Sequence, residues 1–115
     1  MSPYIYAGLA QQQYPPRSVA HIVAVVAAHY DLLPSQLATD SRQHPVAVAR
    51  HLVLYLCHLT QPTLAYTLLG KRCFLKAKSG KAVKYAITTI ENQLRYDHAF
   101  ALHVNTLIKT LHIKI

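Results

Sequence analysis

The sequence predicts an all-α protein of five to six helices. Apolar residues recur at spacings of three and four along most of the chain, which is the helical period. No segment shows the alternation typical of a strand, and three glycines leave few hairpin turns. Because 52% of the residues are apolar and 14% are charged, the chain can build a hydrophobic core. Its 115 residues suit one domain, so we expect an irregular arm over 1–16 and a helical domain over 17–115.

Local start signals place the first half of the helices. Ser18 is a good N-cap for a helix over 19–29. Pro34 fits the first position of a short helical turn that buries Leu37. A long helix is then expected over 45–59, because its apolar residues form one stripe. These residues are Val48, Leu52, Tyr55, Leu56 and Leu59.

A compact helix over 62–69 is predicted next. Thr60 is its expected cap, with Pro62 in the first turn. Gly70 stands where a helix commonly ends in a left-handed residue. The segment 71–78 would then be a basic connector.

Two further capped helices complete the chain. Ser79 is the expected cap of a helix over 80–95, and Asp97 that of a helix over 98–111. Each has an apolar stripe that should face inward. The stripes are Val83, Ala86, Ile87, Ile90 and Leu94 in the first, and Phe100, Val104, Leu107 and Leu111 in the second.

The charge is unevenly distributed along the chain. No acidic residue lies between Asp40 and Glu91, yet that stretch holds eight of the twelve lysines and arginines. The net charge of the whole chain is +8. They are Arg42, Arg50, Lys71, Arg72, Lys76, Lys78, Lys81 and Lys84. Such a field attracts polyanions over about 8 Å at physiological salt, and nucleic acid is the commonest such partner. A solvated surface face is the alternative interpretation of a charge run standing alone.

The two helices around the basic segment have the pattern of a helix-turn-helix. Off the apolar stripe of the second helix, Lys81, Lys84 and Tyr85 share one outward face, where we expect contacts to the major groove. Ser79 and the helix start would hold a phosphate. Flanking contacts are expected in two groups: Arg42 and Arg50 on the backbone or adjacent minor groove, and Lys71, Arg72, Lys76 and Lys78 on phosphates.

Over about residues 19–112 the chain resembles the C-terminal DNA-binding domain of the DnaA family of bacterial replication initiators. Three groups of residues carry the resemblance. They are Ile22-Val23 through His29-Tyr30 to Leu37; Val46-Ala47-Val48-Ala49-Arg50 with Leu52 to Leu56 and Leu59-Thr60; and Ile90, Leu94, Asp97, Phe100, Val104, Leu107 and Leu111. The resemblance implies a helix-turn-helix of the DnaA C-terminal or Trp-repressor-like type, with double-stranded DNA as ligand.

The recognition element departs from that family's signature. In place of Gly-Arg-Asp-His-Thr-Thr-Val the chain has Ala77-Lys78-Ser79-Gly80-Lys81-Ala82-Val83. The resemblance therefore does not extend to reading the initiators' nine-base-pair box. No P-loop is present, and in a chain that starts at Met1 without a nucleotide-hydrolysing domain we expect no ATP-driven unwinding. A stand-alone regulator or competitor related to the initiators is the expected role.

Other classes of protein fit the composition less well. Four carboxylates are scattered singly and no histidines or cysteines have metal-ligand spacing, so we expect no enzyme, cofactor, metal or small-molecule substrate. Polar residues interrupt both long apolar stretches, so no membrane span is expected. Without a leader pattern the location should be cytoplasmic, on the nucleoid if DNA is bound. Cys57 is expected in the core, and a disulfide with Cys73 stays open.

The alternative hypothesis is a helical protein–protein interaction module that keeps the fold without base-specific reading. It would bind an acidic protein surface or pair with itself through arm residues such as Tyr4, Tyr6 and Tyr14. A homodimer is also compatible with DNA binding, since helix-turn-helix proteins often read two half-sites. RNA binding is the third hypothesis. The scarcity of aromatic residues among the basic ones counts against it, because RNA-binding proteins commonly stack bases on aromatic side chains.

Overall fold

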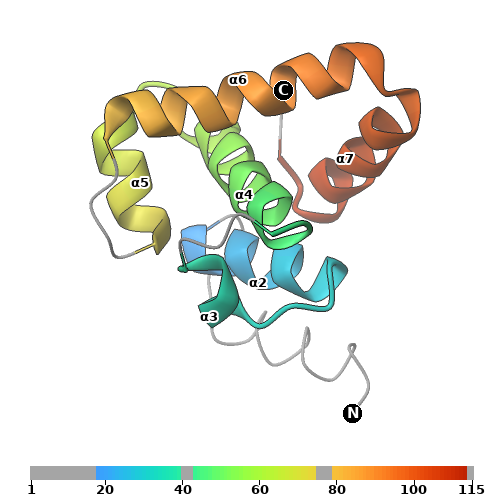
Figure 1. Ribbon diagram of the computed structural model, residues 1–115, viewed down its shortest axis with the longest axis horizontal. Coiled ribbons are helices and arrows are strands. Elements are labelled where there is room, and N and C mark those ends of the chain that lie inside the picture. Colours follow the sequence, from blue (N-terminus) through green and yellow to red (C-terminus); the bar gives the residue numbers. More distant parts are fainter. Residues whose placement is uncertain (1–17, 40–42, 75–78, 114–115) are drawn as a thin grey trace.

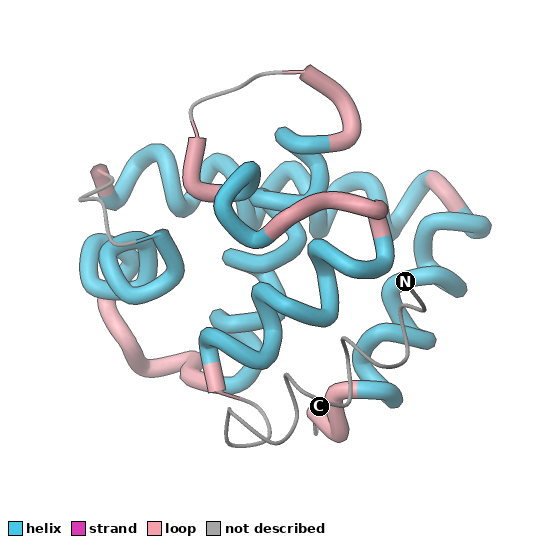
Figure 2. The backbone as a smooth tube through the Cα atoms, turned by 90° about the horizontal axis from the view of Figure 1, so that it is seen from below, coloured by secondary structure: helices cyan, strands magenta, loops and turns pink. Residues whose placement is uncertain are grey.

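The structure is a computed structural model that describes residues 18–39, 43–74 and 79–113. Within these ranges it has six helices and no strand, and Figure 2 shows that all the regular structure is helical. The helices are α2 (Val19–His29), α3 (Pro34–Leu37), α4 (Val46–Thr60), α5 (Tyr66–Phe74), α6 (Gly80–Tyr96) and α7 (His98–Thr110). The predicted all-α fold is confirmed. The arm expected over 1–16 lies outside the described residues.

Three helices, α2, α6 and α7, begin at the N-cap residues that the sequence predicts. In each case the cap's side-chain oxygen accepts a hydrogen bond from the backbone N–H three residues later, which satisfies one of the donors left open at a helix start. The pairs are Ser18 with His21 at 3.1 Å, Ser79 with Ala82 at 3.1 Å, and Asp97 with Phe100 at 3.0 Å. The predicted bounds of α2, α4, α6 and α7 are confirmed to within one residue.

The helix predicted over 62–69 is wrong in its position. Thr60 does not cap it: α4 continues through Thr60, whose hydroxyl donates to the carbonyl of Cys57 at 2.8 Å. α5 begins four residues later than predicted and runs through Gly70 for another turn. Gly70 is a buried helical residue, and no described glycine has a positive φ. Packing of α5 on its neighbours, with Leu69 fully buried, overrides both local signals.

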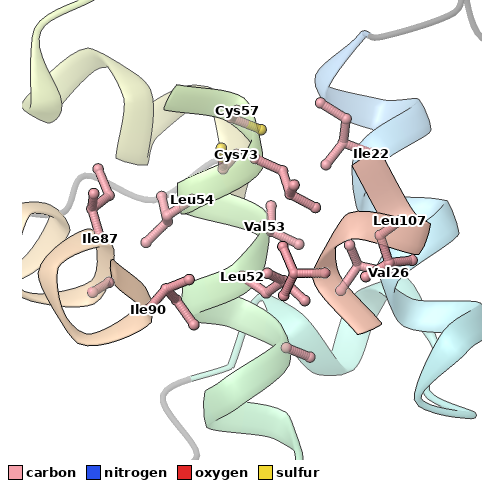
Figure 3. Close-up of a cluster of buried hydrophobic side chains, with 14 of the residues drawn as sticks. Ile22, Val26, Leu52, Val53, Leu54, Cys57, Cys73, Ile87, Ile90 and Leu107 are labelled. Atoms are coloured by element: carbon pink, nitrogen blue, oxygen red, sulfur yellow. The ribbon is translucent and has the colours of Figure 1, made fainter. Parts of the chain in front are cut away.

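α4 lies at the centre of the molecule and packs against α2, α3, α5 and α6. In Figure 1, α6 runs across the top, with α5 below its amino end and α7 below its carboxyl end. Figure 3 shows that Leu54 points toward Ile87 of α6, whereas Val53 points toward Val26 of α2. The buried residues form one core cluster. None of the described helices combines the length and apolar composition of a membrane-spanning segment.

Two thiols meet inside this core. Cys57 of α4 is fully buried, and Cys73, at the end of α5, is 8% exposed. Figure 3 shows them side by side, and both are free. The hydrogen-bonding contact with Cys73, and then burial, raise the pKa of the Cys57 thiol well above its ordinary value. The predicted burial of Cys57 is confirmed, and the basic segment contributes Cys73 to the core instead of being a loop throughout.

Candidate nucleic-acid interface

The amino-terminal half of α6 presents a cationic and aromatic face. Lys81, Lys84 and Tyr85 are exposed, and Tyr85 keeps 67% of its surface accessible. On the opposite side of the helix the stripe of Val83, Ala86, Ile87 and Ile90 is buried. The predicted division of this helix into an inward and an outward face is therefore confirmed.

The positive charge on this face has no counter-ion among the described residues. Neither Lys81 nor Lys84 forms an ion pair with any part of the chain that the structure describes. The acid on the same helix, Glu91, lies about three turns from the helix start, beside α4. Burial, and second to it the Glu91 carboxylate, raise the pKa of the Tyr55 hydroxyl on α4. No described carboxylate therefore neutralises the charge on the first turns of α6.

The start of α6 is held against the start of α5. A Cβ added to Gly80 would lie 3.4 Å from Oγ1 of Thr67 and 4.0 Å from Cβ of Tyr66, which are ordinary contact distances. The two helices pack along each other and against α4. This arrangement is the bihelical unit of a helix-turn-helix, in which the second helix buries one face in the core and leaves the other exposed.

A pocket of about 370 Å³ lies between α4 and α6, next to this face. Its polar lining is Arg50 and His51 from α4 with Lys81 and Tyr85 from α6, and its apolar lining is Leu54, Ala82, Val83 and Ala86. The rings of His51 and Tyr85 meet edge to face, with centroids 6.1 Å apart and planes at 86°. The pocket therefore joins cationic and hydrogen-bonding groups from two helices.

Arg50, predicted to grip the DNA backbone or minor groove, is only 8% exposed. Its Nη1 donates to the carbonyl of Thr39 at 2.7 Å, which ties α4 to the residue that follows the α3 turn. The structure nevertheless brings Arg50 to the same pocket as Lys81. His51 was not among the predicted site residues. No sequence signal singled it out, because Leu54, three residues later and facing α6, lies outside the apolar stripe predicted for this helix.

The remaining predicted cations are more widely distributed. Lys71 and Arg72 are exposed on the last turns of α5, and Nη1 of Arg72 donates to Oε1 of Gln61 at 3.0 Å. Because α6 begins against the opposite end of α5, at Thr67, Lys71 is set back from it by about 6 Å along the α5 axis. Arg42, Lys76 and Lys78 lie outside the described residues. Within the described ranges, no group of three metal-ligating side chains occurs.

Comparison with known proteins identifies the family. A family model described as the bacterial DnaA protein helix-turn-helix matches residues 19–90. The chromosomal replication initiator protein DnaA of Bacteroides thetaiotaomicron is 27% identical over 107 residues, 93% of this chain, and that of Bacteroides fragilis is 30% identical over 95 residues, 80% of this chain. The chain spans 22% and 19% of the lengths of these relatives.

No solved structure matches the chain. The matched region of the family runs from the start of α2 into α6 and so includes both helices of the bihelical unit. The chain therefore belongs to the bacterial DnaA helix-turn-helix family.

Proposed function

We propose that the protein binds double-stranded DNA, with the amino-terminal half of α6 in the major groove. One observation carries this proposal: Lys81, Lys84 and Tyr85 share an exposed face of the second helix of a helix-turn-helix, without a described counter-ion. Lysine can meet a phosphate or the O6 and N7 atoms of guanine, and a tyrosine hydroxyl can add a hydrogen bond. Membership of the family supports the same ligand.

Other residues would position the protein on the duplex. Ser79 marks the start of α6, where the backbone N–H groups and the helix dipole favour a phosphate. Lys71 and Arg72 on α5 would contact phosphates farther along, and Arg42, Lys76 and Lys78 are proposed for the same task. Arg50 would act at the edge of the groove from its place in the α4–α6 pocket. No chemical step is part of this role.

The biological role that we propose is control of replication or transcription by occupation of DNA. The two relatives are named replication initiators, and this chain corresponds to about a fifth of each. A protein that occupies DNA in this way would compete with an initiator or act as a regulator on the nucleoid. Selection of bound duplexes from a random pool tests this role, because an enriched motif indicates a site-specific regulator and a flat pool contradicts one.

Charge reversal tests DNA binding directly. Lys81→Glu with Lys84→Glu should weaken duplex binding at least about tenfold, since each lost contact is worth about 1–3 kcal/mol. Arg95→Glu with Lys109→Glu is the matched control, because both residues are exposed, lie away from the start of α6, and change the net charge equally. Affinity is measured by fluorescence anisotropy, and circular dichroism checks the fold. Equal affinities of the two double variants would contradict the proposal.

A further inference from the structure

Two free thiols meet between α4 and α5, in the part of the core that supports the bihelical unit. Cys57 lies on α4 and Cys73 on the last turn of α5, and Figure 3 shows their sulfurs side by side. We propose that this pair is a reversible oxidation site, at which a hydroperoxide such as hydrogen peroxide joins the two sulfurs in a disulfide that links α5 to α4. The proposed DNA contacts use neither sulfur, so the oxidation site is an additional property of the protein.

The two helices hold the thiols in the arrangement that a disulfide needs. α4 and α5 pack directly on each other, and the Cys57 and Cys73 side chains are in hydrogen-bonding contact. Two cysteines on neighbouring helices can be bridged only when their Cβ atoms face each other at short range, because otherwise the backbone would have to move. Thiols that already touch across a helix interface meet this condition, so oxidation can follow without a change of fold.

The two thiols differ in their access to solvent. Cys73 is 8% exposed, whereas Cys57 is fully buried. A small neutral oxidant can therefore reach Cys73 at the edge of the core, while Cys57 is shielded from direct attack. A sulfenic acid formed at Cys73 would have the Cys57 thiol as its neighbour, and a nearby thiol captures a sulfenic acid before further oxygen is added.

The oxidation occurs in two balanced steps. The Cys73 sulfur attacks one oxygen of hydrogen peroxide, the O–O bond breaks, and the thiol proton leaves in the first water as Cys73 becomes a sulfenic acid. The Cys57 sulfur then attacks the Cys73 sulfur, and its proton leaves with the hydroxyl group as the second water while the S–S bond forms. Two electrons pass from the thiols to one peroxide. A dithiol reverses the modification by exchange and becomes a disulfide itself.

The link would stabilise the bihelical unit. The disulfide would close a loop over residues 58–72, which contains the end of α4 and most of α5. A closed loop restricts the unfolded chain and so favours the folded one. Because α5 packs against α6 as well as α4, the arrangement that presents the exposed face of α6 should persist to a higher temperature in the oxidised protein.

The experiment treats the full chain with a small excess of hydrogen peroxide. The intact protein should lose two hydrogen atoms, and its melting temperature should rise by at least about 5 °C and return after treatment with dithiothreitol. Trypsin cleaves after Lys71 and Arg72, which puts the two cysteines on separate peptides that remain joined by the S–S bond. Thiols that stay reduced, oxygen added without a link, or links only between molecules would overturn the proposal.

Single variants show whether the effect belongs to the pair. Cys73→Ala should fold, since its side chain lies at the edge of the core, and should lose the rise in melting temperature. Cys57→Ala should leave Cys73 without a partner, so that peroxide adds oxygen to it. Met1, the remaining sulfur-containing residue, can gain oxygen but cannot form the link. An equal rise in melting temperature in either variant would overturn the pair as its source. Cys73→Ser serves the same purpose if Cys73→Ala lowers the helicity.

Binding of a duplex at increasing temperature separates this inference from the proposed function. The temperature at which binding is half lost should rise together with the melting temperature of the oxidised protein. If the oxidised protein gains stability and neither form binds duplex, the oxidation site stands and the proposed function fails. If duplex binding is present and peroxide forms no link, the oxidation site is overturned while DNA binding stands.

Discussion

Ser79 and Ser18 have the same structural task at different places in the molecule. Each caps a helix by accepting a backbone N–H at 3.1 Å, but only Ser79 stands at the proposed DNA-binding end of α6. Replacing either serine by alanine should cost about 1 kcal/mol of unfolding free energy, measured by urea denaturation. Ser79→Ala should also weaken duplex binding severalfold, whereas Ser18→Ala should not. Equal duplex affinities would remove Ser79 from the interface.

We expect His103 to make the stability of the protein depend on pH. Burial, and then the neighbouring His29, lower the pKa of His103; the centroids of the two rings are 4.1 Å apart, and Nε2 of His103 lies 3.2 Å from the Tyr30 hydroxyl. Burial also lowers the pKa of His21. In the unfolded chain these histidines bind a proton near pH 6.5, whereas the folded protein binds it only at lower pH.

Stability should therefore be greatest above about pH 6.5 and fall as the pH is lowered through that value, because the unfolded state then binds more protons. Thermal unfolding between pH 7.5 and 5.5 measures this dependence. His103→Gln should flatten it, and His98→Gln, at an exposed position, should leave it unchanged. A pH dependence that is unaffected by His103→Gln would exclude the pair of rings as its source.

The helices that the sequence predicts well are those whose ends are decided locally. Ser18, Ser79 and Asp97 each satisfy an N–H three residues away, so a single sequence contains the whole signal. Thr60 and Gly70 look like equally clear signals and are misleading. Their outcome depends on how α5 packs against α4 and α6, and such contacts between distant parts of the chain have no local signature.

The candidate site likewise has one part that the sequence predicts and one part that it does not. Helical periodicity after Ser79 suffices to place Lys81, Lys84 and Tyr85 on one outward face. The pocket requires α4 to cross α6 with Arg50 and its neighbour toward Lys81, and no pattern of apolar residues encodes that crossing. The buried position of Arg50 was unexpected for the same reason, because an arginine at the start of a helix ordinarily predicts solvent exposure.

Two neighbouring leucines test how α5 is fixed. Leu69 is fully buried and Leu68 is 49% exposed, although they are adjacent on one helix and identical in helix propensity. Leu69→Ala should cost about 2–5 kcal/mol of unfolding free energy, because it leaves a cavity under the bihelical unit. Leu68→Ala should cost well under half as much. Chemical denaturation measures both, and similar losses would contradict the orientation of α5.

Electrostatics of the full chain predict a steep dependence of binding on salt. If about six of the cations neutralise phosphates, log affinity should fall against log salt with a slope of about −5. Lys81→Glu with Lys84→Glu should make the slope shallower by about two. Titrations of one duplex between 50 and 200 mM salt, roughly the range in which this effect is large, provide the test. A slope shallower than about −2 would exclude an extended phosphate contact surface.

The two buried thiols, Cys57 and Cys73, can report local opening of the protein. Because Cys57 is fully buried, a reagent should alkylate its sulfur only when α4 and α5 separate, so the labelling rate of Cys57 reports how often the bihelical unit opens. A duplex bound to α6 should lower this labelling rate without contacting either sulfur.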